Sequence, residues 1–78
     1  MYYFVTELQS RPDGIVNSTI TQRSNLANGL AYWLDRASKA PASTTLVKVA
    51  LTLQDQYGAV IEPWNMCFDT LYEAPEES

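Results

Sequence analysis

The chain has 78 residues, enough for one small domain with a single hydrophobic core. It contains no histidine and only one thiol, Cys67, which excludes an internal disulfide, histidine-based catalysis and a four-ligand structural zinc site. We therefore expect no catalytic residues, no metal and no cofactor. A domain this small buries only about 60–65% of its unfolded surface, so an unusually tidy core or self-association must stabilise it.

The net charge of −4 is unevenly distributed along the chain. Residues 1–68 are neutral, and the excess carboxylates lie at Asp69, Glu73, Glu76 and Glu77. We interpret residues 73–78 as a solvated acidic tail after a single domain of residues 1–72. Because no basic stripe is visible, we expect no direct binding to DNA or RNA. The start of the chain lacks the pattern of a signal peptide, and no apolar run is long enough for a membrane span, so we expect a cytoplasmic protein without a membrane partner.

The first part of the chain predicts a β-hairpin. Residues 2–9 are rich in aromatic and β-branched side chains, and residues 15–22 form a second, more polar segment of the same kind. Between them, residues 11–14 read Arg-Pro-Asp-Gly. Proline fixes φ at the second position of a turn, and glycine supplies a positive φ at its end, so this tetrapeptide predicts the turn of the hairpin.

A helix is predicted after the hairpin because the apolar period changes from two to 3.6. Ser24 is the predicted N-cap, Pro41 ends the helix, and Gly29 allows a close approach to a neighbouring element. The predicted core-facing stripe consists of Leu26, Leu30, Trp33, Leu34 and Ala37. The side chains predicted to lie mostly on the opposite, solvent-facing side are Asn25, Asn28, Tyr32, Asp35, Arg36 and Lys39.

A second hairpin is predicted from residue 45 onward, where the period of two returns. Residues 55–58 form its turn, and residues 59–68 form its second strand, in which Pro63 predicts a sheet edge or a bulge. In the third strand, Val47, Val49, Leu51 and Leu53 are predicted to share one face, and Leu46, Lys48, Ala50 and Thr52 the other. Strict alternation in the fourth strand places Val60, Trp64, Met66 and Phe68 on one face, and Ala59, Ile61 and Cys67 on the other. We expect Cys67 to be a small core residue.

The element order ββαββ predicts an α+β fold, in which two hairpins form a four-stranded antiparallel sheet with one helix on one face. One helix covers only one face, yet apolar side chains occur on both faces of the predicted sheet. At about 25 cal/mol per Å², leaving several of them in water forfeits several kcal/mol. We therefore predict a homodimer or higher oligomer, the alternative being a monomer with a few exposed aromatic side chains.

Two groups of residues are candidate binding sites. The first is a cationic and aromatic cluster at the helix, suited to an anionic nucleotide, and consists of Arg23, Tyr32, Arg36 and Lys39. The alternative interpretation is an ordinary solvated helix face. The second is a candidate protein interface, chosen because tryptophan dominates binding hot spots, and consists of Tyr3, Pro63, Trp64, Met66 and Phe68. Its alternative interpretation is packing against a second copy of the chain.

No nucleophile motif or phosphate-binding loop is present, so we do not expect an enzyme. Three segments carry a resemblance to known proteins: residues 2–8 (Tyr-Tyr-Phe-Val-Thr-Glu-Leu), 21–25 (Thr-Gln-Arg-Ser-Asn) and 49–58 (Val-Ala-Leu-Thr-Leu-Gln-Asp-Gln-Tyr-Gly). In architecture the chain resembles short proteins of unknown function encoded by bacteriophages and mobile elements. Many of these look like accessory proteins that blunt host immunity.

The resemblance implies a non-catalytic, oligomeric binding protein that antagonises a host defence component. Such a protein sequesters a nucleotide signal or blocks a nuclease complex by binding a host protein. The alternative from another class is a structural or assembly protein, such as a minor virion or scaffold component, which predicts larger assemblies and no small ligand.

Overall fold

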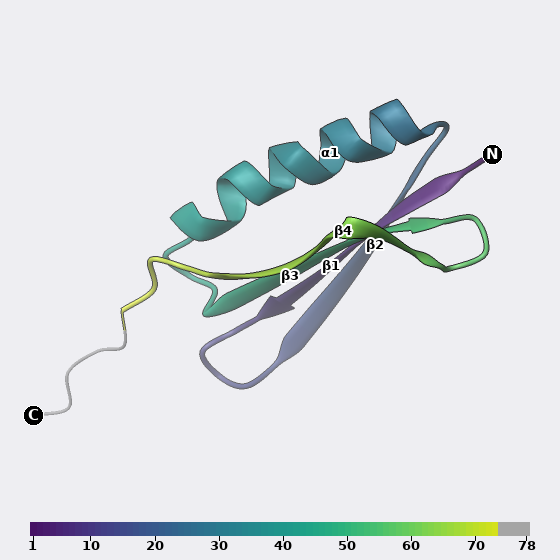
Figure 1. Ribbon diagram of the computed structural model, residues 1–78. Coiled ribbons are helices and arrows are strands. Elements are labelled where there is room, and N and C mark those ends of the chain that lie inside the picture. The colour runs from purple at the N-terminus through teal and green to yellow at the C-terminus, as the bar shows by residue number, and fades with distance from the viewer. Residues whose placement is uncertain (74–78) are drawn as a thin grey trace, which may run out of the picture.

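The computed structural model describes residues 1–73 and has the predicted ββαββ order, with four antiparallel strands in one sheet and a helix across one face (Figure 1). The elements are β1 (Tyr3–Ser10), β2 (Val16–Arg23), α1 (Leu26–Lys39), the short 3₁₀ helix η1 (Ala40–Ala42), β3 (Lys48–Asp55) and β4 (Val60–Asp69). The α+β fold class is thereby confirmed. Of the predicted acidic tail, residues 73–78, all but Glu73 lie outside the described residues.

Both hairpins form where the turn residues predict them. Gly14 closes the first turn with a φ of 88°, and its N–H donates to the carbonyl of Arg11 at 3.1 Å. Gly58 closes the second with a φ of 85°, and its N–H donates to the carbonyl of Asp55 at 3.0 Å. These are left-handed backbone conformations that cost other residues free energy, so the two glycines fix where each strand ends.

The strand order in the sheet is β2-β1-β3-β4, so each hairpin contributes one central strand and one edge strand. β1 and β3 pair from Tyr3 opposite Asp55 to Ser10 opposite Lys48, with no irregularity along the seam. Because paired residues share a face, Val5 and Glu7 of β1 lie on the same side as Leu53 and Leu51 of β3, and this is the side that α1 covers.

The hydrophobic core lies between this face and α1. Its buried side chains are Val5, Trp33, Ala40, Val49, Leu51 and Leu53. The ring of Trp33 meets that of Trp64 edge-on at 5.3 Å and lies 6.2 Å from Phe68. A Cβ on Gly29 would stand 3.2 Å from Leu53 Cδ1, so this glycine does allow the helix to approach the sheet closely, as predicted.

The N-cap of α1 is Asn25, which corrects the prediction of Ser24. Asn25 has an extended backbone, and its side-chain oxygen accepts a hydrogen bond from the N–H of Asn28 at 2.8 Å. The Ser24 hydroxyl instead accepts from the side chain of Asn28 and satisfies no backbone group of the helix. The side-chain oxygen of Asn25 therefore provides an acceptor for one of the otherwise unpaired N–H groups at the start of the helix.

We expect Asn25→Ala to lower the free energy of unfolding by about 1 kcal/mol, because it leaves the Asn28 N–H without its acceptor. Ser24→Ala is the matched control and should change stability by less than about 0.5 kcal/mol. Urea denaturation of both variants checks this. Equal losses in the two variants would contradict the assignment of the cap.

The pairing of β3 with β4 is interrupted around Pro63, which confirms the predicted edge position and bulge. Between the pairs Gln54–Val60 and Thr52–Asn65, β3 advances by two residues and β4 by five, so β4 contains three extra residues. An odd number of extra residues exchanges the two faces of a strand. The prediction that Val60 and Trp64 share a face is therefore wrong: Val60 lies on the uncovered face, opposite Gln54, whereas Ile61 and Trp64 both pack against the core.

No described segment covers the sheet face that points away from α1. Its apolar side chains include Val16 and Ile20, which are 58% and 67% exposed, and they alternate with uncharged polar groups. Cys67 lies on this face opposite Ala50 and is exposed, so the prediction of a core cysteine is wrong. Among the described residues that pair in the sheet, the charged side chains on this face are Lys48 and Asp69, which stand 3.9 Å apart at one end of the sheet. We call this the open face.

Candidate interaction surface

The predicted cationic cluster at the helix is largely neutralised by ion pairs. Arg36 was predicted to face solvent, but it lies under α1 against β1. Its Nε donates to Glu7 Oε1 at 2.8 Å and its Nη2 donates to Glu7 Oε2 at 3.0 Å, which is a two-point guanidinium–carboxylate pair. Glu7 is only 5% exposed, and it also accepts a hydrogen bond from the side chain of Gln9.

This ion pair shifts the titration of both partners. The hydrogen bonds from Arg36 hold the pKa of the Glu7 carboxyl below its ordinary value of 4.5, although burial acts in the opposite direction. The same hydrogen bonds raise the pKa of the Arg36 guanidinium. A buried carboxylate needs such a partner, because an unpaired charge in the core is strongly destabilising.

The other members of the cluster are also engaged. The guanidinium of Arg23 lies over the ring of Tyr32, 4.5 Å from its centroid, and the Tyr32 hydroxyl accepts from the hydroxyl of Thr21 at 3.3 Å. Tyr32 is therefore half-buried on the flank of α1 above β2, not on the outer face as predicted. Lys39 faces solvent as predicted, and its ammonium donates to Asp35 at 3.2 Å.

Charge reversal at Arg36 would therefore disturb the fold as well as the cluster. A carboxylate at position 36 would stand against the buried carboxylate of Glu7. Within the described residues, Arg23 is the one cationic member of the cluster that has no carboxylate partner. A single stacked guanidinium is a weak basis for capturing a nucleotide.

The candidate protein interface is better assembled. Trp64 and Phe68 pack beside Trp33, and Met66 lies opposite Leu51 on the same side of the sheet. Met66 is 50% exposed, whereas Trp64 and Phe68 are half-buried. Pro63 precedes them on the same edge strand and is exposed. Four of the five predicted interface residues thus follow one another along β4.

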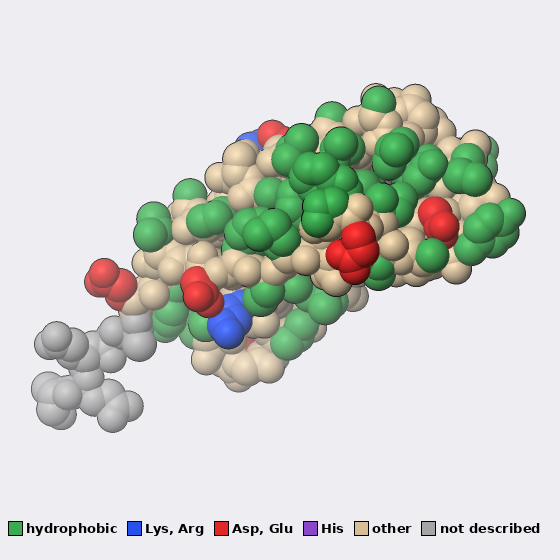
Figure 2. All heavy atoms as spheres, in the orientation of Figure 1, with side chains coloured by type: hydrophobic (Ala, Val, Ile, Leu, Met, Phe, Trp, Pro, Cys, Tyr) green, Lys and Arg blue, Asp and Glu red, His purple; other side chains and the backbone are tan. Residues whose placement is uncertain are grey.

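The helix contributes leucines to the same side of the molecule. Tyr32 and Arg36 mark the flank of α1 that faces β2 and β1, so Leu30 and Leu34 lie on the other flank, beside β4. Leu34 and Leu26 were predicted to face the core, but they are 47% and 44% exposed. In Figure 2 hydrophobic side chains gather on the face that α1 and β4 form. We define the α1/β4 surface as Leu26, Leu30, Leu34, Ile61, Trp64, Met66 and Phe68.

Tyr3 does not belong to the α1/β4 surface, although it was predicted with the other interface residues. It lies at the start of β1, two strands away from β4 in the order of the sheet, and it packs against the core below Gly29. Sequence reasoning missed Leu26, Leu30 and Leu34 as surface residues because their helical spacing is that of a core stripe. The helix carries more large apolar side chains than one narrow face can bury, and this excess was the signal that could have identified them.

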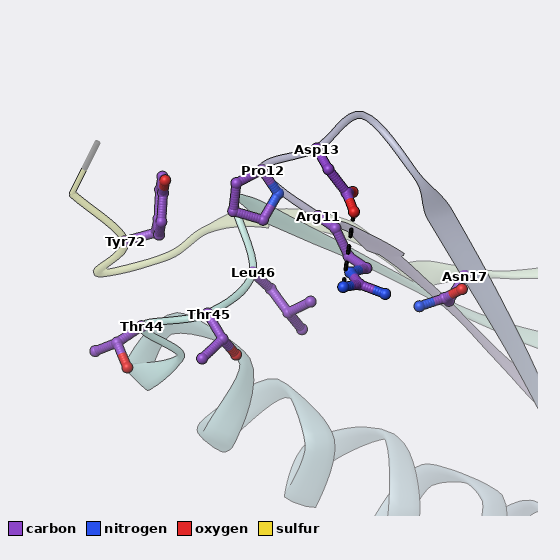
Figure 3. Close-up of a pocket in the computed structure, with 8 residues that line it drawn as sticks. All are labelled: Arg11, Pro12, Asp13, Asn17, Thr44, Thr45, Leu46 and Tyr72. Carbon is purple, nitrogen blue, oxygen red and sulfur yellow. Dashed lines mark ion pairs between the residues drawn. The ribbon is translucent and has the colours of Figure 1, made fainter. Parts of the chain in front are cut away.

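A hollow of about 680 Å³ opens at the other end of the sheet (Figure 3). It lies between the turn of the first hairpin, the segment that leads into β3 and Tyr72. Arg11 is its one cationic side chain, and it pairs with Asp13 of the same turn at 3.6 Å. Both side chains are about half exposed, so the hollow is open to solvent and holds no unpaired charge.

Among residues 1–73 no group of three or more cysteine, aspartate and glutamate side chains is arranged to hold a metal ion. Within the same residues, no helix has both the length and the hydropathy needed to cross a bilayer. Comparisons of the chain with models of protein families, with curated proteins and with solved structures each found no match.

Proposed function

We propose that this chain is a non-catalytic binding protein that docks on a protein partner through the α1/β4 surface. The observation that carries the proposal is the exposure of Leu34 and Met66 next to half-buried tryptophan and phenylalanine rings. Contiguous apolar surface of this composition, with methionine and aromatic side chains at its centre, is typical of protein–protein interfaces.

Charge at the margin of the surface indicates the chemistry of the partner. Glu62 is exposed on β4, next to Pro63, and it has no ion-pair partner among the described residues. We therefore expect the partner to present an apolar patch with a basic rim, which complements this carboxylate.

The resemblance in architecture to short phage-encoded proteins, noted in the sequence, favours a host defence component as the target. The geometry favours the form of antagonism in which a protein complex, such as a nuclease, is blocked. The form in which a nucleotide signal is sequestered has less support, because Arg36 and Lys39 already bind carboxylates of the same chain.

The proposal predicts that bacteria expressing this chain lose protection from at least one nuclease-based defence system, measured as the plating efficiency of a phage that the system restricts. We expect Leu34→Lys/Met66→Lys to abolish this effect, because two buried ammonium groups at an interface cost several kcal/mol. The matched control is Ala31→Lys/Cys67→Lys, which adds the same charge on the outer side of α1 and on the open face.

Binding of the purified target by wild type and both double variants then gives the direct measurement. We expect at least about a hundredfold weaker binding for Leu34→Lys/Met66→Lys and less than about threefold for the control. Equal binding by the two variants would rule out the α1/β4 surface. Assembly of the wild type into large particles without any effect on phage plating would favour the structural or scaffold alternative.

A further inference from the structure

A second interaction surface is the free edge of β2, on the opposite side of the sheet from β4. All eight residues of β2 pair with β1, from Val16 opposite Ser10 to Arg23 opposite Tyr3, without a bulge. On its other side β2 has no described neighbour, and the residues from Val16 to Ile20 are all exposed. The strand is therefore a long, regular edge.

The hydrogen-bond pattern shows which backbone groups are free. The N–H of Arg11 donates to the carbonyl of Ile15 at 2.9 Å, so this pair at the turn is a hydrogen-bonded one. Hydrogen-bonded and non-bonded pairs alternate along an antiparallel ladder. The residues of β2 whose backbone groups form hydrogen bonds with β1 are thus Asn17, Thr19, Thr21 and Arg23. The residues that direct N–H and C=O groups toward the free edge are Val16, Ser18, Ile20 and Gln22.

This edge lacks the features that keep sheet edges apart. Natural edge strands are protected by charged side chains, prolines, bulges or covering segments. β4 has a proline and a bulge at Pro63, and it carries Glu62 and Asp69. Between Val16 and Gln22, β2 has no charged residue and no proline. Only one of the two edges of the sheet is therefore protected.

We propose that β2 pairs with β2 of a second copy, antiparallel and about a twofold axis perpendicular to the sheet, to form one continuous eight-stranded sheet. Such an axis keeps each face of the sheet on its own side, so paired residues must come from the same face. One register uses all the free groups. It places Val16 opposite the partner subunit's Gln22, Ser18 opposite the partner subunit's Ile20, and Thr19 opposite its own counterpart.

The absence of charge repulsion favours a second copy as the occupant of this edge. In the stated register no two charged side chains stand opposite each other, because the two Arg23 residues lie at opposite ends of the junction. Each Ile20 also gains a neighbour on the open face, where it is otherwise 67% exposed. An uncharged strand that is complementary to itself needs no other partner to satisfy its edge.

Analytical ultracentrifugation of the whole chain across the micromolar range tests the proposal. We expect a monomer–dimer equilibrium for the wild type. Ser18→Lys/Ile20→Lys should weaken it by at least about a hundredfold, because each new lysine faces another across the junction. The matched control, Asn65→Lys/Cys67→Lys, adds the same charge to the open face at the β4 edge and should leave the dimer unchanged. A monomeric wild type, or a dimer that survives the lysines at β2, would overturn the proposal.

Two further experiments keep the test independent of any loss of folding. An equimolar mixture of Ser18→Lys/Ile20→Lys with Ser18→Glu/Ile20→Glu should form a heterodimer, because each lysine then faces a glutamate. In a Cys67→Ser background, Thr19→Cys should form a disulfide between copies under mild oxidation, since opposite residues of a non-bonded pair have Cα atoms about 4.5 Å apart. Ile20→Cys should remain reduced. Cross-linking at position 20 and not at position 19, or no heterodimer, would contradict the stated pairing.

Discussion

Trp33→Ala should remove about 3–5 kcal/mol from the free energy of unfolding. The ring is 3% exposed and packs on Trp64 and Phe68, so its removal leaves a large cavity between α1 and β4. Removal of such a side chain costs about 3–5 kcal/mol, whereas a domain of this length has about 4–12 kcal/mol of total stability. We expect urea denaturation followed by circular dichroism to show a transition at a much lower urea concentration than in the wild type.

Leu34→Ala is the matched control for this prediction, since Leu34 is the next residue in the same helix but about half exposed. We expect it to change the free energy of unfolding by less than about 1 kcal/mol. Trp33→Phe should lie between the two, because the Trp33 Nε1–H has no acceptor among the described residues and its loss leaves no unpaired group. Similar stabilities of the two alanine variants would contradict the assignment of Trp33 as the centre of the core.

The second large effect is expected from Arg36→Met, and it depends on pH. Glu7 would then keep a buried carboxylate with only Gln9 as a described hydrogen-bond donor. Loss of one partner of such a pair costs about 3 kcal/mol at neutral pH, somewhat less than for a fully buried pair because Arg36 is partly exposed. Thermal denaturation at pH 7 measures this loss.

The direction of the pH dependence identifies the cause. In the wild type the folded pKa of Glu7 lies below its ordinary value of 4.5. Its contribution to stability is therefore fully present above pH 4.5 and is lost as the pH falls through the folded pKa. In Arg36→Met, burial without the guanidinium raises the pKa of Glu7, so acid neutralises the unpaired charge. The difference between the two proteins should shrink as the pH is lowered from 7 toward 3.5, to about 1 kcal/mol or less.

The double variant Glu7→Leu/Arg36→Met provides the control for packing. It removes both charges and leaves no unpaired group in the core, so it should recover most of the lost stability at neutral pH. A difference between wild type and Arg36→Met that stays constant with pH would show that Arg36 contributes through packing of its side chain alone.

The fold was predictable because its signals are local and mutually consistent. The period of two in residues 45–53, the glycines of both turns and the 3.6-residue period after residue 24 each specify one element, and antiparallel hairpins then allow few arrangements. The size of the bulge in β4 was not predictable. Pro63 indicates an interruption, but whether one, two or three extra residues are present decides which side chains reach the core, and no local signal gives that number.

The cationic cluster was mispredicted because each element was considered alone. On the helix, Arg36 lies among polar residues and looks solvent-exposed. However, the alternation of β1 places Glu7 on the same face as Tyr3 and Val5, which is the core face. A carboxylate at a core position implies a cation on the element that covers it, and that inference across two elements would have identified Arg36.

The strand order has a consequence for how the chain folds. Each hairpin is closed by a tight turn and can form by itself, whereas the β1–β3 seam joins segments about forty residues apart, such as Leu8 and Ala50. The search for this pairing, with α1 as the connection, then limits the folding rate. The β1–β3 seam is also where a domain swap can occur, in which the first hairpin of one chain pairs with the second hairpin of another chain. In such a swapped dimer every core contact is retained, and only the connection around α1 changes direction.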